Sequence, residues 1–138
     1  MYTKDTVSDG YCVFFHLIRK SMIKKERRQA TMEFEYETKT GSLRVYTPRE
    51  IDECAASELR TELDMLIDNY QIRRLIFDFM NTEFMDSSGI GMLIGRSRKM
   101  GYSGGYVEAD HLNERVQKIF MLAGLPKLIS VVKEEVYD

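Results

Sequence analysis

The sequence of 138 residues is poor in cysteine and histidine, with two of each, and it has no excess of basic over acidic residues. Two cysteines are too few for a disulfide framework, so we place the chain in a reducing cytoplasm. Twenty lysines and arginines stand against 22 acidic residues, and this balance argues against generic nucleic-acid binding. The apolar run at residues 11–18 is less than half as long as the roughly 20 residues of a membrane span.

Motifs of catalysis and cofactor binding are also missing. The sequence has no phosphate-binding loop of the GxxxxGK[ST] type, and residues 85–89 lack the first glycine of the GxSxG hydrolase elbow. We interpret His111 as a solvated loop residue and Cys54 as a small, partly buried filler. Cys12 and His16 form a metal-ligand pair with no second pair to complete a tetrahedral site. We therefore predict no catalytic residue, no metal and no cofactor.

Charge divides the chain into two unequal parts. Residues 1–31 carry seven basic and three acidic side chains, whereas residues 32–138 carry 13 basic and 19 acidic ones. We interpret residues 1–31 as an N-terminal extension that is disordered or results from a misassigned start, with Met32 as the true first residue. The alternative is a basic amphipathic helix within residues 11–28 that lies on a membrane surface.

Hydrophobic patterns in residues 32–138 predict alternating strands and helices. Residues 33–37 alternate apolar with charged side chains, and residues 43–46 form the second arm of a hairpin after a turn at 40–42. Residues 54–70 are predicted to form a helix with one apolar face, made of Leu59, Leu63, Leu66, Ile67 and Tyr70. The remaining predicted elements are a strand at 75–79, a helix at 87–100 ended by Gly101, a strand at 106–108, a helix at 113–123 and a strand at 128–132.

This order of elements predicts a single α/β domain over residues 32–138. Its sheet is expected to be mixed but mostly parallel, with about five strands and with helices packed against it. Ligand and partner sites in such sheets lie beyond the C-terminal ends of the strands.

One cluster at such a position stands out, the segment TEFMDSSGIG at residues 82–91. Capping by Asp86 or Ser87, with glycines for close packing, explains part of it. Capping does not require Phe-Met before the cap or paired serines and glycines after it.

Within this cluster, the segment FMDSSGIG at residues 84–91 resembles the phosphorylation-site motif of the anti-sigma factor antagonists, which belong to the STAS domain family. The similarity extends over residues 32–132. It includes Glu50-Ile51-Asp52, Gly104-Gly105, Ile119-Phe120 and Ala123-Gly124-Leu125.

The resemblance implies a regulatory mechanism called partner switching. The unmodified antagonist binds an anti-sigma factor that is itself a serine kinase and thereby frees a sigma factor. Sporulation is the expected process, and a stress response is the alternative. The kinase phosphorylates the antagonist at the residue matching Ser87, and a serine phosphatase resets it. The resemblance thus implies a cytoplasmic, monomeric, non-enzymatic protein.

The implied partner-binding residues surround the acceptor serine. Asp52 matches an acidic residue near it, and we expect Asp52 to support binding rather than folding. Small and apolar residues at the helix start are expected to let the partner approach closely. The full set is Asp52, Asp86, Ser87, Ser88, Gly89, Ile90, Gly91 and Met92.

Two departures from the family pattern and two alternatives remain. Arg49 stands where relatives have glycine, and the chain ends soon after the last predicted strand.

One alternative function is a serine hydrolase that uses Ser87 or Ser88 with His111 as the base. The other is a membrane- or lipid-associated STAS module anchored through residues 11–28.

Overall fold

The computed structural model describes residues 32–132. The predicted extension at residues 1–31 therefore lies outside the described residues. The elements in chain order are β1 (Glu33–Glu37), β2 (Ser42–Tyr46), β3 (Glu50–Ile51), α2 (Glu53–Asn69), β4 (Arg74–Asp78), β5 (Phe84–Met85), α3 (Ser87–Tyr102), β6 (Tyr106–Asp110), α4 (Glu114–Leu122), the short 3₁₀-helix η1 (Leu125–Lys127) and β7 (Ser130–Val131).

The main sheet has five strands in the order β1-β2-β4-β6-β7. β1 and β2 form an antiparallel hairpin, and every other pair in this sheet is parallel. The predicted α/β class and the mixed, mostly parallel sheet are confirmed. The last predicted strand, at 128–132, is wrong in extent. The 3₁₀-helix η1 ends at Lys127, and β7 covers only Ser130 and Val131.

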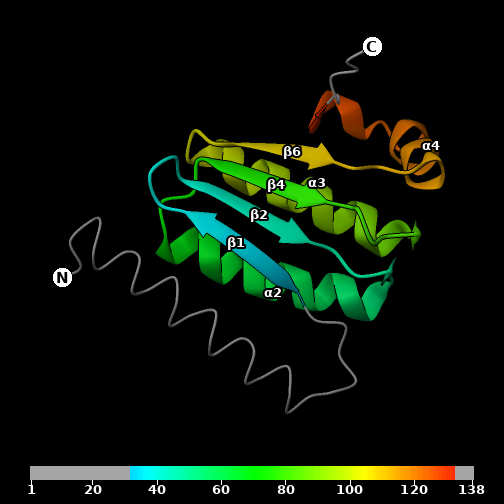
Figure 1. Cartoon of the computed structure of the whole chain (residues 1–138), viewed down its shortest axis with the longest axis horizontal. Helices are drawn as coiled ribbons and strands as arrows, with labels where there is room; N and C mark the ends of the chain where they lie inside the picture. The colour runs from blue at the N-terminus through cyan, green and yellow to red at the C-terminus, as the bar shows by residue number, and fades with distance from the viewer. Residues whose placement is uncertain (1–31, 133–138) are drawn as a thin grey trace.

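The core lies between the sheet and the helices α2 and α3, which run side by side along it (Figure 1). Strand residues alternate between the two faces of a sheet, so every second side chain of β2, β4 and β6 joins this core. Leu75 and Phe77 of β4 are both fully buried there. The helix face predicted for residues 54–70 is confirmed, since its three leucines are buried and Ile67 and Tyr70 pack against the core.

The opposite face of the sheet carries charged side chains. Arg44 of β2 contacts Asp78 of β4 and Asp110 of β6, and Arg74 pairs with Glu108. Apart from the buried Ile76 of β4, the alternation along these strands therefore separates an apolar face from a charged one.

The end of α3 differs from the prediction. Gly101 does not stop the helix, which continues to Tyr102 with Ser103 as its C-cap. The left-handed backbone that reverses the chain occurs at Gly104, where φ is 84°. None of the helices in residues 32–132 is both long enough and apolar enough to cross a membrane.

Candidate functional site

Two short strands hold the predicted site. β3 and β5 pair in parallel, with Glu50 opposite Phe84 and Ile51 opposite Met85. β3 leads directly into α2 and β5 leads directly into α3. Neighbouring strands lie about 5 Å apart, so the pair brings the first turns of the two helices together. The sequence pattern missed both strands because two residues are too few to show an alternation.

Asp86 forms the turn from β5 into α3. Its carboxylate oxygen Oδ1 accepts hydrogen bonds from the backbone N–H groups of Ser88 (2.8 Å) and Gly89 (3.3 Å). Its own N–H donates to the carbonyl of Ile51 (3.2 Å), which ties the helix start to β3. Asp86 is therefore an N-cap, the residue that satisfies otherwise unpaired N–H groups at a helix start.

Ser87 is the first residue of α3 and is exposed. Ser88, the next residue, is half-buried. Successive residues leave a helix about 100° apart, which explains why the two serines differ in exposure. Ser87 thus presents its side chain at a helix N-terminus, where the helix dipole favours negative charge.

Asp52 occupies the matching position at the start of α2. Its Oδ1 accepts from the N–H of Ala55 (2.9 Å), and its side chain lies at the surface. It directly follows Ile51, the register partner of Met85, so Asp52 lies beside Asp86. The expectation that Asp52 has no role in folding is wrong, because Asp52 caps a helix of 17 residues.

The two glycines of the motif have different environments. A Cβ at Gly89 would lie 2.9 Å from Ile51 Cγ2 and 3.1 Å from both the Ile51 carbonyl oxygen and Met85 Cβ. Gly89 is buried and allows α3 to pack against the β3–β5 pair, which corrects its assignment to the partner surface. Gly91 is exposed, and a Cβ there would meet no atom within 4 Å.

The apolar residues of the motif also divide between core and surface. Met92 is 1% exposed and belongs to the core, so its assignment as a direct partner contact is wrong. Ile90 is only partly buried. Helical geometry explains this, because Met92 follows Gly89 by three residues and shares its inward-facing side.

The predicted partner-binding set leaves out two exposed apolar side chains that precede α3. Phe84 is 44% exposed and Met80 is 58% exposed, although both belong to the segment between β4 and α3. The signal available in the sequence was the presence of large apolar residues directly after the end of a buried strand.

The family glycine is replaced by Arg49 without backbone strain. Within residues 32–132, His111 alone among the non-glycine residues has a positive φ. Arg49 therefore does not adopt the left-handed conformation. The Arg49 carbonyl accepts from the N–H of Glu83 (2.7 Å), and its side chain pairs with the Glu83 carboxylate (3.1 Å). Both side chains are exposed, so this ion pair adds little stability.

A buried threonine positions the segment that precedes the site. Thr82 is 0% exposed and donates to the Pro48 carbonyl (2.7 Å), and its hydroxyl also contacts that of Thr47. The Asn113 side chain, which caps α4, donates to the Thr82 carbonyl (2.8 Å). These bonds connect three parts of the chain and fix where β5 begins.

Two further interpretations have different outcomes. His111 is exposed in a loop, as predicted, and its ring nitrogen Nδ1 also lies 3.0 Å from Asp78 Oδ1. Cys54 is exposed in the first turn of α2 rather than partly buried.

A comparison with known families matches the STAS domain over residues 33–138. The chain belongs to the STAS domain family. The family expected from the motif is therefore confirmed.

Curated relatives of this STAS domain include anti-sigma factor antagonists. An anti-sigma F factor antagonist of Paenibacillus polymyxa is 29% identical over 105 residues, which cover 76% of this chain and 90% of the relative. An anti-sigma-B factor antagonist of Bacillus subtilis (strain 168) is 28% identical over 91 residues, 66% of this chain and 82% of the relative.

Solved structures agree on the fold. The anti-sigma factor antagonist SpoIIAA in its unphosphorylated form matches with a TM-score of 0.67 and 25% identity, over 75% of this chain and 90% of that one. The phosphorylated form of the Bacillus protein matches with a TM-score of 0.61 and 24% identity, over 75% and 93% of the two chains.

Proposed function

We propose that this STAS domain is an anti-sigma factor antagonist that is switched off by phosphorylation of Ser87. Its relatives are named as antagonists of this kind. The observation that carries the proposal is the exposed Ser87 at the first position of α3, beside the carboxylates of Asp86 and Asp52. A hydroxyl held in this way can enter a kinase active site without unfolding of the domain.

The charge around Ser87 explains how phosphate would release a partner. Phosphorylation adds about −1.5 to −2 charges next to two carboxylates. In the free protein, the dipole at the helix N-terminus stabilises the added phosphate charge by roughly 0.3–1 kcal/mol. An interface that brings like charges together costs several kcal/mol, and about 2.7 kcal/mol already lowers affinity a hundredfold. Phosphorylation therefore breaks the complex and leaves the fold intact.

The proposed partner is an anti-sigma factor with serine kinase activity. Bound to the unmodified antagonist, it releases its sigma factor, and a serine phosphatase later restores the antagonist. All of these steps take place in the cytoplasm, and regulation of sporulation is the process proposed for this chain. The antagonist itself acts as a monomer and catalyses no reaction.

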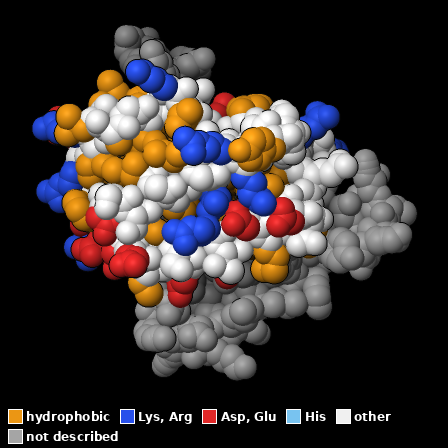
Figure 2. Space-filling view, turned by 180° about the vertical axis from the view of Figure 1, so that it is seen from behind, with side chains coloured by type: hydrophobic (Ala, Val, Ile, Leu, Met, Phe, Trp, Pro, Cys, Tyr) orange, Lys and Arg blue, Asp and Glu red, His pale blue; other side chains and the backbone are white. Residues whose placement is uncertain are grey.

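The surface offered to the partner is smaller than the motif. Asp52, Ser88, Ile90 and Gly91 surround Ser87, whereas Gly89 and Met92 support this surface from below. The exposed phenyl ring of Phe84 extends the surface along β5. The face shown in Figure 2, seen from behind the view of Figure 1, mixes basic, acidic and apolar side chains rather than presenting charge of one sign.

The test uses the kinase-type anti-sigma factor of the same genome. With ATP, this kinase is expected to phosphorylate Ser87 alone. Ser87→Ala is expected to bind the kinase permanently, because it keeps a small uncharged surface. Ser87→Asp is expected to bind poorly, although it carries less charge than phosphate. Mass spectrometry of the reaction and a binding titration of each variant give both readouts.

Ser88→Ala is the matched control, because it changes the adjacent hydroxyl and leaves Ser87 in place. It is expected to be phosphorylated at the normal rate. Phosphate on Ser88 with Ser87 unmodified would overturn the assignment. Failure of every form to bind the anti-sigma factor would overturn the proposed function itself.

The two alternative functions make different predictions. A hydrolase would need His111 as its base, but that ring contacts Asp78, whose side chain points away from the apolar core that α3 shares with the sheet. Such an enzyme would react with a fluorophosphonate, and we expect no reaction. A membrane-associated module would require residues 11–28, so liposome co-sedimentation of the full chain and of a Met32-start chain distinguishes that case.

A further inference from the structure

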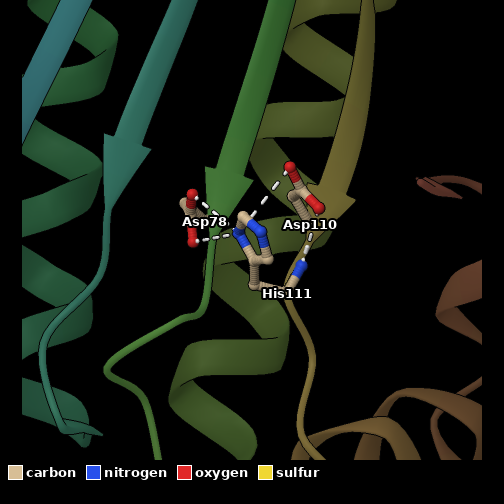
Figure 3. A group of neighbouring side chains, drawn as sticks. All are labelled: Asp78, Asp110 and His111. Atoms are coloured by element: carbon tan, nitrogen blue, oxygen red, sulfur yellow. Dashed lines mark hydrogen bonds and ion pairs between the residues drawn. The ribbon is translucent and has the colours of Figure 1, made fainter. Parts of the chain in front are cut away.

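Three side chains that have no part in the proposed function meet at one end of the sheet. Asp78 ends β4, Asp110 ends β6, and His111 is the next residue (Figure 3). The imidazole ring lies between the two carboxylates, which point toward it from adjacent strands. The cluster lies on the charged face of the sheet, opposite the face against which α3 packs.

The distances within this cluster match those around a bound metal ion. His111 Nδ1 is 3.0 Å from Asp78 Oδ1, 3.1 Å from Asp78 Oδ2 and 3.8 Å from Asp110 Oδ2. One donor atom from each residue can be chosen so that all three lie within 4.8 Å of one another. Ligands at roughly 2.0–2.2 Å from a divalent ion are separated from each other by about 3.0–3.5 Å. Small shifts of the side chains would therefore place three donors around one ion.

The sequence and backbone hold these donors in place. The side chain of Asp78 is 2% exposed and its Oδ1 also accepts from the N–H of Met80 (3.0 Å). Asp110 Oδ1 accepts from the N–H of His111 (2.8 Å), so one carboxylate oxygen orients the residue and the other remains directed at the cluster. The His111 side chain is 35% exposed, which leaves a route for an ion and room for water ligands.

We propose that Asp78, Asp110 and His111 form a binding site for a divalent transition-metal ion such as Zn²⁺ or Co²⁺. An imidazole nitrogen combined with two carboxylates favours these ions over Mg²⁺ and Ca²⁺, which prefer oxygen ligands alone. The absence of a thiolate from the cluster disfavours Cu(I). Three protein ligands leave at least one position open.

Arg44 is the competitor for this site. Its Nη1 lies 2.5 Å from Asp78 Oδ2 and 3.1 Å from Asp110 Oδ2. Burial alone would lower the pKa of Arg44, but the hydrogen bonds to Asp110 and Asp78 outweigh it and the pKa is raised, so Arg44 stays charged. A divalent ion would take the place of this guanidinium between the two carboxylates, while Arg44, 27% exposed, turns toward solvent.

The test uses the full chain without an affinity tag, titrated with Co²⁺ and followed by visible absorption. We expect one equivalent of Co²⁺ to give d–d bands that Zn²⁺ abolishes. His111→Gln is expected to weaken binding at least about tenfold, and Arg44→Met to strengthen it by about tenfold because a competing positive charge is removed. Far-UV circular dichroism verifies that each variant is folded.

His16→Gln is the matched control, because His16 and His111 are the two histidines of the chain. It is expected to leave the Co²⁺ spectrum and affinity unchanged. Lack of d–d bands at millimolar Co²⁺, or bands that survive His111→Gln and disappear with His16→Gln, would overturn the proposal. The experiment requires no anti-sigma factor, so its outcome is independent of the proposed function.

Discussion

Asp52 and Asp86 are structural counterparts: each directly follows one strand of the β3–β5 pair and caps the helix that comes next. Their carboxylates therefore do two things at once. They satisfy backbone N–H groups at the starts of α2 and α3, and they place negative charge on both sides of the proposed phosphorylation site. A substitution at either position affects stability and charge together, unless the replacement separates the two.

Asparagine at position 52 separates the two roles. Asp52→Asn keeps a side-chain oxygen for the N–H of Ala55, so the free energy of unfolding is expected to change by only a few tenths of a kcal/mol. Asp52→Ala loses the cap and is expected to cost about 1 kcal/mol, a drop in Tm of about 4–8 °C. Thermal unfolding of both variants measures the difference.

Binding of the anti-sigma factor to the same two variants tests the charge of Asp52. If this charge contributes to the interface, Asp52→Asn and Asp52→Ala weaken binding or phosphorylation to a similar extent despite their different stabilities. Normal binding by Asp52→Asn would restrict Asp52 to its capping role.

The fold was predictable from the sequence where elements are long enough to show a period. The helix over residues 54–70 has about three turns of apolar spacing between Leu59 and Tyr70, and the strand at 75–79 is a nearly continuous apolar run, so both were found. β3 and β5 were not found, because two residues give no period and their pairing depends on contacts across the domain.

The site was predictable only where a motif marks it. The order Asp86-Ser87 indicates a cap followed by an exposed residue, and the structure has this arrangement. Gly89 and Met92 were placed on the wrong side because the direction in which α3 faces is set by its packing against Ile51 and Met85. The contact of His111 with Asp78 was not predicted because the two residues lie 33 positions apart in sequence.

An ion pair between α2 and α3 provides a second prediction. Arg96 Nε lies 3.1 Å from Asp64 Oδ1, and the Arg96 side chain is 9% exposed. Burial lowers the pKa of Arg96, and the charge of Asp64 offsets this only in part. Asp64→Asn leaves a buried guanidinium without its counter-charge and is expected to cost about 1–3 kcal/mol, less than a fully buried pair because Asp64 is 35% exposed.

Two further variants complete this test by urea denaturation. Arg96→Met replaces the buried charge with an apolar side chain and is expected to change stability by less than about 1 kcal/mol. Asp68→Asn breaks the more exposed pair with Lys99, 2.9 Å long, and is expected to cost less than about 1 kcal/mol. Equal losses for Asp64→Asn and Asp68→Asn would contradict the role assigned to burial.

A chain that starts at Met32 is expected to fold as well as the full chain. Met32 itself is 3% exposed and belongs to the core, so the cut must leave it in place. We expect the free energy of unfolding to change by less than about 0.5 kcal/mol, as for a surface change. A loss of more than about 2 kcal/mol in urea denaturation would assign residues 1–31 a structural role.

Gly89→Ala is expected to destabilise the domain. The added Cβ would meet the Ile51 carbonyl oxygen at 3.1 Å, and a backbone atom cannot move aside as a flexible side chain can. The expected cost is about 1–3 kcal/mol, in the range of other overpacked sites. A stability equal to that of the unmodified chain would show that α3 can shift away from β3 at little cost.

Gly91→Ala is expected to have the opposite effect on stability and to weaken partner binding. A Cβ at this exposed position meets no atom within 4 Å, so alanine is expected to stabilise α3 by about 0.5–1 kcal/mol. The same methyl group would project from the first turn after Ser87, into the surface proposed for the anti-sigma factor.

Gly101→Ala is the matched control, because it also has open space around it but lies about 15 Å further along the helix. Urea denaturation is expected to rank Gly91→Ala above the unmodified chain, while a binding titration shows weaker binding for Gly91→Ala alone. Unchanged affinity of Gly91→Ala would mean that the partner does not approach this side of α3, and the proposed surface would then shift toward Phe84 and Asp52.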